Sequence, residues 1–69
     1  MNGWIKVSEK RPSEEDYYLV TIETTYLNEP RYEDFKRSVC IKHTSVWKEI
    51  ENYGEVVIAW MPLPEPYNA

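Results

Sequence analysis

Hydrophobic and polar residues alternate with a period of two along residues 17–26, the spacing that places successive side chains on opposite faces of a β-strand. Almost every residue in this run is a good strand former. One face of the predicted strand carries Tyr18, Val20, Ile22 and Thr24. We predict that this strand lies at the centre of a sheet.

A second alternation covers residues 35–43 and predicts another strand. One of its faces carries Phe35, Arg37, Val39, Ile41 and His43. The other face carries Lys36, Ser38, Cys40 and Lys42. We expect the second set to face solvent.

The rest of the pattern predicts shorter elements. Residues 55–61 are apolar on both faces, which is typical of a central strand that is covered on each side. Residues 4–7 indicate a short edge strand, and residues 52–54 a turn. Residues 45–50 fit either a short strand or the apolar stripe of a helical turn, and we favour the strand.

Together these elements predict one mainly β domain over residues 1–69: a small, curved antiparallel sheet or a barrel-like meander, with room for one short helical turn. A chain this short buries only about 60% of the surface that its unfolded form exposes, so its three Trp and six Tyr residues must supply much of the interior. The predicted core consists of Trp4, Val20, Ile22, Trp47, Ile58, Trp60 and Leu63.

Both ends of the chain carry motifs that resemble a family of small bacterial and phage proteins, domain-of-unknown-function family 551. The opening, residues 4–12, is similar to the family pattern Trp-Ile-x-Val followed by polar residues and Arg-Leu-Pro, with Lys10 and Arg11 in place of Arg-Leu. The closing segment, residues 57–66, resembles Val-Thr-His-Trp-Met-Pro-Leu-Pro-Glu-Pro, with Ala59 in place of His. The resemblance implies a compact fold and a phage or prophage setting, and it implies no activity.

The residues offer little for catalysis. His43 is the single histidine, and Cys40 the single cysteine, which is too few for a transition-metal site or an intramolecular disulfide. We interpret His43 as an ordinary surface or boundary residue and Cys40 as a partly exposed thiol. No nucleophile is paired with a base, and no two carboxylates have a recognisable catalytic spacing. We therefore expect a protein that is not an enzyme and that uses no metal or cofactor.

The net charge of −4 favours a basic partner over nucleic acid, because a phosphate-backbone binder needs clustered lysines and arginines. We expect a non-catalytic, phage-type protein-interaction module. Inhibition of a host defence protein is one role that such a module could have. No signal peptide or transmembrane run is evident, so we expect the cytoplasm and no membrane contact. The candidate partner-binding residues are Glu14, Glu15, Asp16, Glu29, Glu33 and Asp34.

Two alternatives use other surfaces. The proline-rich segment over residues 61–64 could dock as an extended chain, although packing of both termini into the core is the interpretation that we favour. A small ligand or an oligonucleotide could instead stack on exposed tyrosines, for which Tyr17, Tyr26, Tyr32 and Tyr53 are the candidates. Direct nucleic-acid binding is not expected, because the basic groove that it needs is missing.

Overall fold

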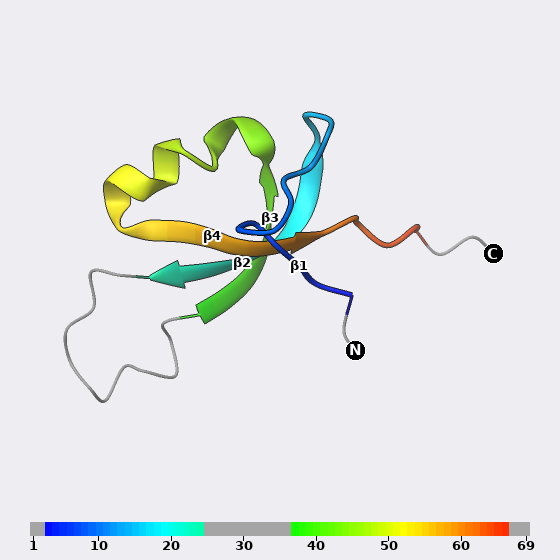
Figure 1. The fold of residues 1–69 in the computed structure, drawn as a ribbon, viewed down its shortest axis with the longest axis horizontal. Coiled ribbons are helices and arrows are strands. Elements are labelled where there is room, and N and C mark those ends of the chain that lie inside the picture. The colour runs from blue at the N-terminus through cyan, green and yellow to red at the C-terminus, as the bar shows by residue number, and fades with distance from the viewer. Residues whose placement is uncertain (1–2, 25–36, 67–69) are drawn as a thin grey trace.

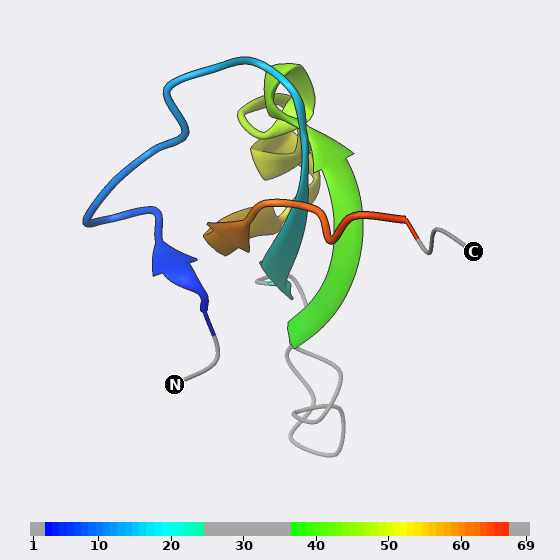
Figure 2. The same cartoon turned by 90° about the vertical axis from the view of Figure 1, so that its right-hand side faces the viewer.

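The computed structural model describes residues 3–24 and 37–66 and contains one four-stranded antiparallel sheet (Figure 1). The strands are β1 (Ile5–Lys6), β2 (Tyr17–Thr24), β3 (Arg37–His43) and β4 (Glu55–Met61). Two short 3₁₀-helices, η2 (Thr44–Val46) and η3 (Glu49–Tyr53), connect β3 to β4. The strand order is β1-β4-β2-β3, so the sheet is open, with β1 and β3 at its edges. The mainly β prediction is confirmed, and the sheet is curved rather than closed into a barrel (Figure 2).

The two strands predicted to be central, β2 and β4, do lie side by side in the middle of the sheet. The alternation along β2 is also confirmed, since Val20 is 0% exposed and Ile22 is 3% exposed. Trp60 lies opposite Val20 on β4 and is buried with it. Because residues that face each other across an antiparallel pair share one side of the sheet, these side chains form the centre of the core.

A β-bulge in β4 changes which of its residues reach the core. Thr21 of β2 lies opposite Ala59, but the next pair is Ile22 with Val57, which leaves Ile58 without a partner on β2. One inserted residue reverses the alternation beyond it. Val57 is consequently buried at 6% exposure, whereas Ile58, which we had placed in the core, is only half-buried. The prediction of Ile58 as a buried core residue is therefore wrong.

The faces of β3 are the reverse of the prediction. Cys40 lies opposite Val20 and packs against the buried core while remaining half-buried. Val39 and Ile41 point to the other side of the sheet and are 59% and 55% exposed. The register with β2 fixes this orientation, because it outweighs the preference of the two larger apolar side chains for burial.

Residues 45–50 form the helical turn that we had considered the weaker alternative, and not a strand. The imidazole Nδ1 of His43 accepts a hydrogen bond from the Ser45 N–H at 3.1 Å and caps η2. Gly54 ends η3 in the left-handed conformation, with φ at 78°, which glycine adopts without a steric penalty. Trp47 lies between the two turns and belongs to the core cluster, with 5% of its surface exposed. Figure 1 shows the two turns joining β3 to β4 at one end of the sheet.

The chain ends meet, but not all of their large side chains enter the core. Ile5 of β1 pairs with Trp60 and packs against the core. Trp4 is one residue out of phase with Ile5 and is only half-buried, and Leu63 is 39% exposed, so neither is the core residue that we predicted. The N-terminal segment contacts Trp60 through a hydrogen bond, in which the Trp60 indole N–H donates to the Lys10 carbonyl at 2.9 Å.

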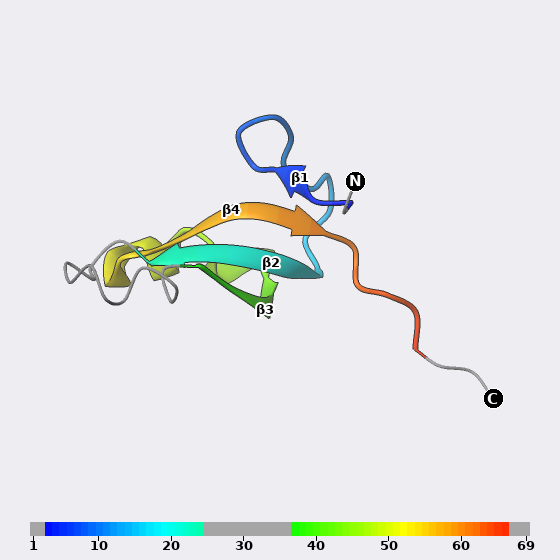
Figure 3. The same ribbon diagram turned by 90° about the horizontal axis from the view of Figure 1, so that it is seen from below.

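The segment after β4 leaves the sheet. Residues 62–66 have no regular secondary structure and are exposed, and they extend away from the strands (Figure 3). Three prolines in this stretch explain why, since proline cannot donate to a strand ladder.

Candidate functional site

The acidic turn, which we define as Glu14, Glu15 and Asp16, lies immediately before β2, and all three residues are exposed. Two hydrogen bonds to Thr44 attach this turn to the start of η2. The Thr44 N–H donates to the Asp16 carbonyl at 3.0 Å, and the Asp16 N–H donates to Thr44 Oγ1 at 3.3 Å. The turn is therefore tied to a segment that lies far away along the chain.

Tyr18 connects the acidic turn to the core. Its hydroxyl donates to the Glu14 carbonyl at 2.9 Å. Its ring packs edge-on against both buried indoles, with centroid distances of 6.2 Å to Trp47 and 5.1 Å to Trp60. One side chain thus contacts the two largest core residues and the backbone of the turn, so the position of the turn depends on the packing of the core.

The carboxylates of the acidic turn affect the pKa of a neighbouring tyrosine, and within the described residues they form no ion pair. Burial raises the pKa of the Tyr18 phenol, and the nearby charges of Asp16 and Glu14 raise it further. Across residues 3–24 and 37–66 the ion pair that the structure shows lies elsewhere, between Arg37 Nε and Glu23 Oε2 at 3.1 Å. Within that part of the chain, no cation pairs with the acidic turn, and its charge is available to a partner.

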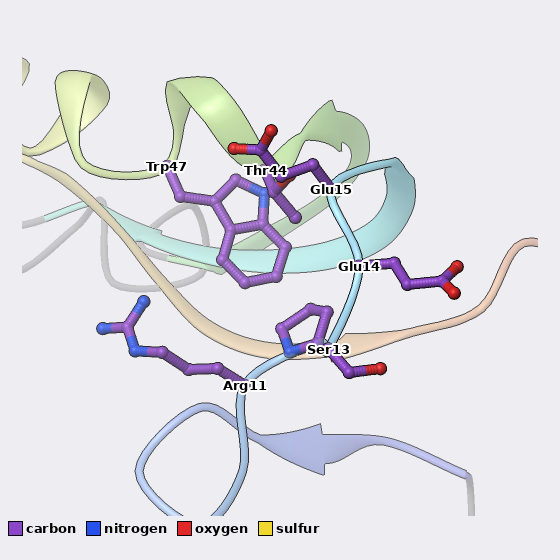
Figure 4. Close-up of a pocket in the computed structure, with 7 residues that line it drawn as sticks. Arg11, Ser13, Glu14, Glu15, Thr44 and Trp47 are labelled. Carbon is purple, nitrogen blue, oxygen red and sulfur yellow. The ribbon is translucent and has the colours of Figure 1, made fainter.

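A small hollow lies beside the acidic turn (Figure 4). Its volume is about 160 Å³, and it is lined by Arg11, Pro12, Ser13, Glu14, Glu15, Thr44 and Trp47. Trp47 is 5% exposed, and its indole Nε1 is buried with no hydrogen-bond acceptor in the part of the chain that the structure describes. We refer to this feature as the indole hollow.

The open face of the sheet carries a second and wider cleft that the sequence analysis did not anticipate. It has a volume of about 650 Å³ and is lined by Trp4, Lys6, Ser8, Thr21, Glu23, Arg37, Ile58 and Ala59. The alternation that puts Trp4 and Lys6 on one face of the first strand could have indicated it. Its guanidinium, Arg37, is already paired with Glu23 across β2 and β3.

The remaining candidate residues are scattered or lie outside the described ranges. Glu29, Glu33 and Asp34 all fall within residues 25–36, as do Tyr26 and Tyr32, and the structure does not describe them. Tyr17, 57% exposed, begins β2, whereas Tyr53, 70% exposed, lies near the start of β4, which pairs with the far end of β2. These two tyrosines therefore do not form one stacking platform.

The two residues with reactive side chains have structural contacts. His43 uses Nδ1 to cap η2, and its ring meets Tyr17 edge-on with a centroid distance of 4.8 Å. Cys40 is a free, half-buried thiol, which agrees with the predicted partial exposure. Among the residues that the structure describes, no three His, Cys, Asp or Glu side chains gather as a metal site. In the same ranges, no helix combines the length and the apolar character needed to cross a bilayer.

Comparison with known proteins gives a family and no further relatives. A family model described as "Protein of unknown function (DUF551)" matches residues 3–68. Neither a curated protein nor a solved structure matches the chain. Since the matched region covers nearly all of the sequence, this chain belongs to the DUF551 family.

Proposed function

We propose that the protein is a non-catalytic interaction module of phage type, which acts in the cytoplasm and binds a basic surface on a host protein through the acidic turn. The observation that carries this proposal is that the backbone of the turn is fixed while its carboxylates are exposed. Hydrogen bonds from Tyr18 and Thr44 hold the main chain at Glu14 and Asp16, and no cation of the described chain pairs with the turn. Inhibition of the bound host protein is the role that we assign to such a complex.

Rigidity of this kind favours binding for a thermodynamic reason. A partner that meets a turn with a fixed backbone does not have to order that backbone, and fixing the backbone of one residue costs about 1–2 kcal/mol. Complementary charge on the turn and on the partner also raises the association rate, and it disfavours partners with an acidic surface. The acidic turn therefore suits a partner with clustered lysines or arginines.

Charge reversal tests the proposal. The double variant Glu14→Lys/Glu15→Lys should weaken the complex with a protein captured from a host lysate by about 10- to 100-fold, because attraction becomes repulsion. The matched control Glu49→Lys/Glu51→Lys makes the same change in net charge at exposed residues of η3 and should leave the affinity nearly unchanged. The measurement is titration calorimetry at low and high salt, and the wild-type affinity should fall as salt screens the charges.

The proposal fails if both double variants bind as the wild type does. A complex that survives charge reversal but is lost in Leu63→Ala would identify a different surface, the proline-rich segment after β4. That second candidate is favoured by one observation, the 39% exposure of Leu63 in an extended segment. An extended proline-rich chain loses little entropy on binding, and an exposed leucine could fill an apolar pocket of a partner.

A further inference from the structure

Trp47, which lines the indole hollow, carries a hydrogen-bond donor that has no acceptor among residues 3–24 and 37–66. Trp47 is 5% exposed, and its Nε1 is shielded from solvent with no partner within the described chain. A buried donor without a partner destabilises a folded protein, so an oxygen atom that reaches it gains a favourable hydrogen bond. The other buried indole, Trp60, shows the ordinary arrangement, because its N–H donates to a main-chain carbonyl, that of Lys10, at 2.9 Å.

The size of the hollow limits what can enter. A volume of about 160 Å³ is smaller than the roughly 300–1,000 Å³ that pockets for drug-sized ligands occupy. A nucleotide is too large for it, whereas a single peptide group or the end of one side chain fits. The occupant must also offer an acceptor, because the indole nitrogen can only donate.

The charge around the hollow selects among acceptors. Glu14 and Glu15 line it with two carboxylates, and Arg11 is the one cation among its described lining residues. In Figure 4 the nitrogen edge of the Trp47 ring is turned toward Thr44 and Glu15, while Arg11 lies on the opposite side of the ring. An anionic acceptor would therefore meet like charge near the nitrogen, whereas a neutral carbonyl next to a cation would be attracted.

We propose that the indole hollow receives a main-chain carbonyl of a basic peptide segment, which accepts the hydrogen bond from Trp47 Nε1 while the adjacent lysine or arginine side chain pairs with Glu14 or Glu15. This inference rests on the proposed function, since it specifies how a basic partner is bound at the acidic turn. Ser13, Glu14 and Glu15 are exposed, and exposed side chains change rotamer within picoseconds to nanoseconds. A change of the Glu15 rotamer would open a path for the carbonyl, since Glu15 lies beside the nitrogen edge of the ring in Figure 4.

The test uses the full chain labelled with ¹⁵N and the blocked peptide N-acetyl-Gly-Arg-Gly-amide as the probe. The indole N–H resonance of Trp47 should shift as the peptide is added. The resonance of Trp60 should stay in place, because its N–H is already bonded to Lys10. The neutral analogue with alanine in place of arginine, and sodium acetate, should each produce a smaller shift of the Trp47 resonance. An equal or larger shift with either of them would overturn the proposal.

The variant Trp47→Phe keeps an aromatic ring and removes the donor, and it should weaken peptide binding by about two- to tenfold, as expected for one hydrogen bond. If this variant does not fold, the wild-type resonances decide the question. Failure of the inference differs from failure of the proposed function. A peptide that binds and is lost in Glu14→Lys/Glu15→Lys, yet leaves the Trp47 resonance unmoved, overturns only the indole hollow. Absence of any peptide binding overturns the indole hollow, whereas the proposed function is decided separately by the charge-reversal variants and the host protein.

Discussion

Replacing Trp60 with alanine is expected to remove a large part of the free energy of unfolding of the protein. The side chain is 6% exposed, lies opposite Val20 and packs against the ring of Tyr18. Truncating a buried tryptophan costs about 3–5 kcal/mol. A domain of 69 residues is expected to have a free energy of unfolding of roughly 3–10 kcal/mol, so one substitution removes much of it. The variant also leaves the Lys10 carbonyl without its donor.

Urea denaturation followed by circular dichroism measures this loss, and Leu63→Ala is the control. Leu63 is 39% exposed in the segment that leaves the sheet, so its truncation should change the free energy of unfolding by less than about 1 kcal/mol. Equal losses in the two variants would show that the family motif at the end of the chain closes the core as a unit, contrary to the structure.

The second large effect is expected on β3, where two neighbouring substitutions should behave in opposite ways. An aspartate in place of Cys40 would put a carboxylate against the core opposite Val20, and we expect a loss of about 2–4 kcal/mol. An aspartate in place of Ile41, which is 55% exposed on the other face, should cost less than about 1 kcal/mol. Both changes introduce the same side chain into the same edge strand.

The comparison is made from the two denaturation midpoints under identical conditions. The alternation of apolar residues along the sequence predicts the opposite order, with Ile41 as the inward residue. A greater loss for Ile41→Asp than for Cys40→Asp would therefore restore the prediction from sequence and contradict the register of β3 on β2.

The strands themselves could be predicted because their signals are local. Residues 17–24 alternate and consist mostly of strand formers, and residues 55–61 form an apolar run between a glycine turn and a proline. Such features depend on neighbouring residues alone. The prediction of β2 and β4 as the central pair followed from the same patterns.

Three features could not be predicted because they depend on pairing between distant residues. The bulge at Ile58 exchanges it for Val57 in the core, and nothing in the local sequence marks the inserted residue. The face of β3 is set by its register with β2, which placed Cys40 inward. The segment around Trp47 fitted two periodicities, and packing of its indole over the sheet selected the 3₁₀ turns.

The acidic turn was predicted as a group of charges, but its rigidity was not. The contact between Asp16 and Thr44 joins residues that are 28 positions apart. The hydroxyl of Tyr18 was expected only to lie on a strand face, and its bond to the Glu14 carbonyl depends on the path of the turn. The indole hollow likewise requires the fold to bring Arg11, Glu15 and Trp47 together.

Amide hydrogen exchange at Thr44 in the wild-type protein is the most direct test of whether the acidic turn is a preformed surface. Its N–H donates to the Asp16 carbonyl, and this bond fixes the acidic turn to η2. After correction for intrinsic rates, we expect Thr44 to exchange at least about 100-fold more slowly than Leu63 in the exposed segment. Exchange of Thr44 as fast as that of Leu63 would show that the acidic turn is free, and would contradict a preformed binding surface.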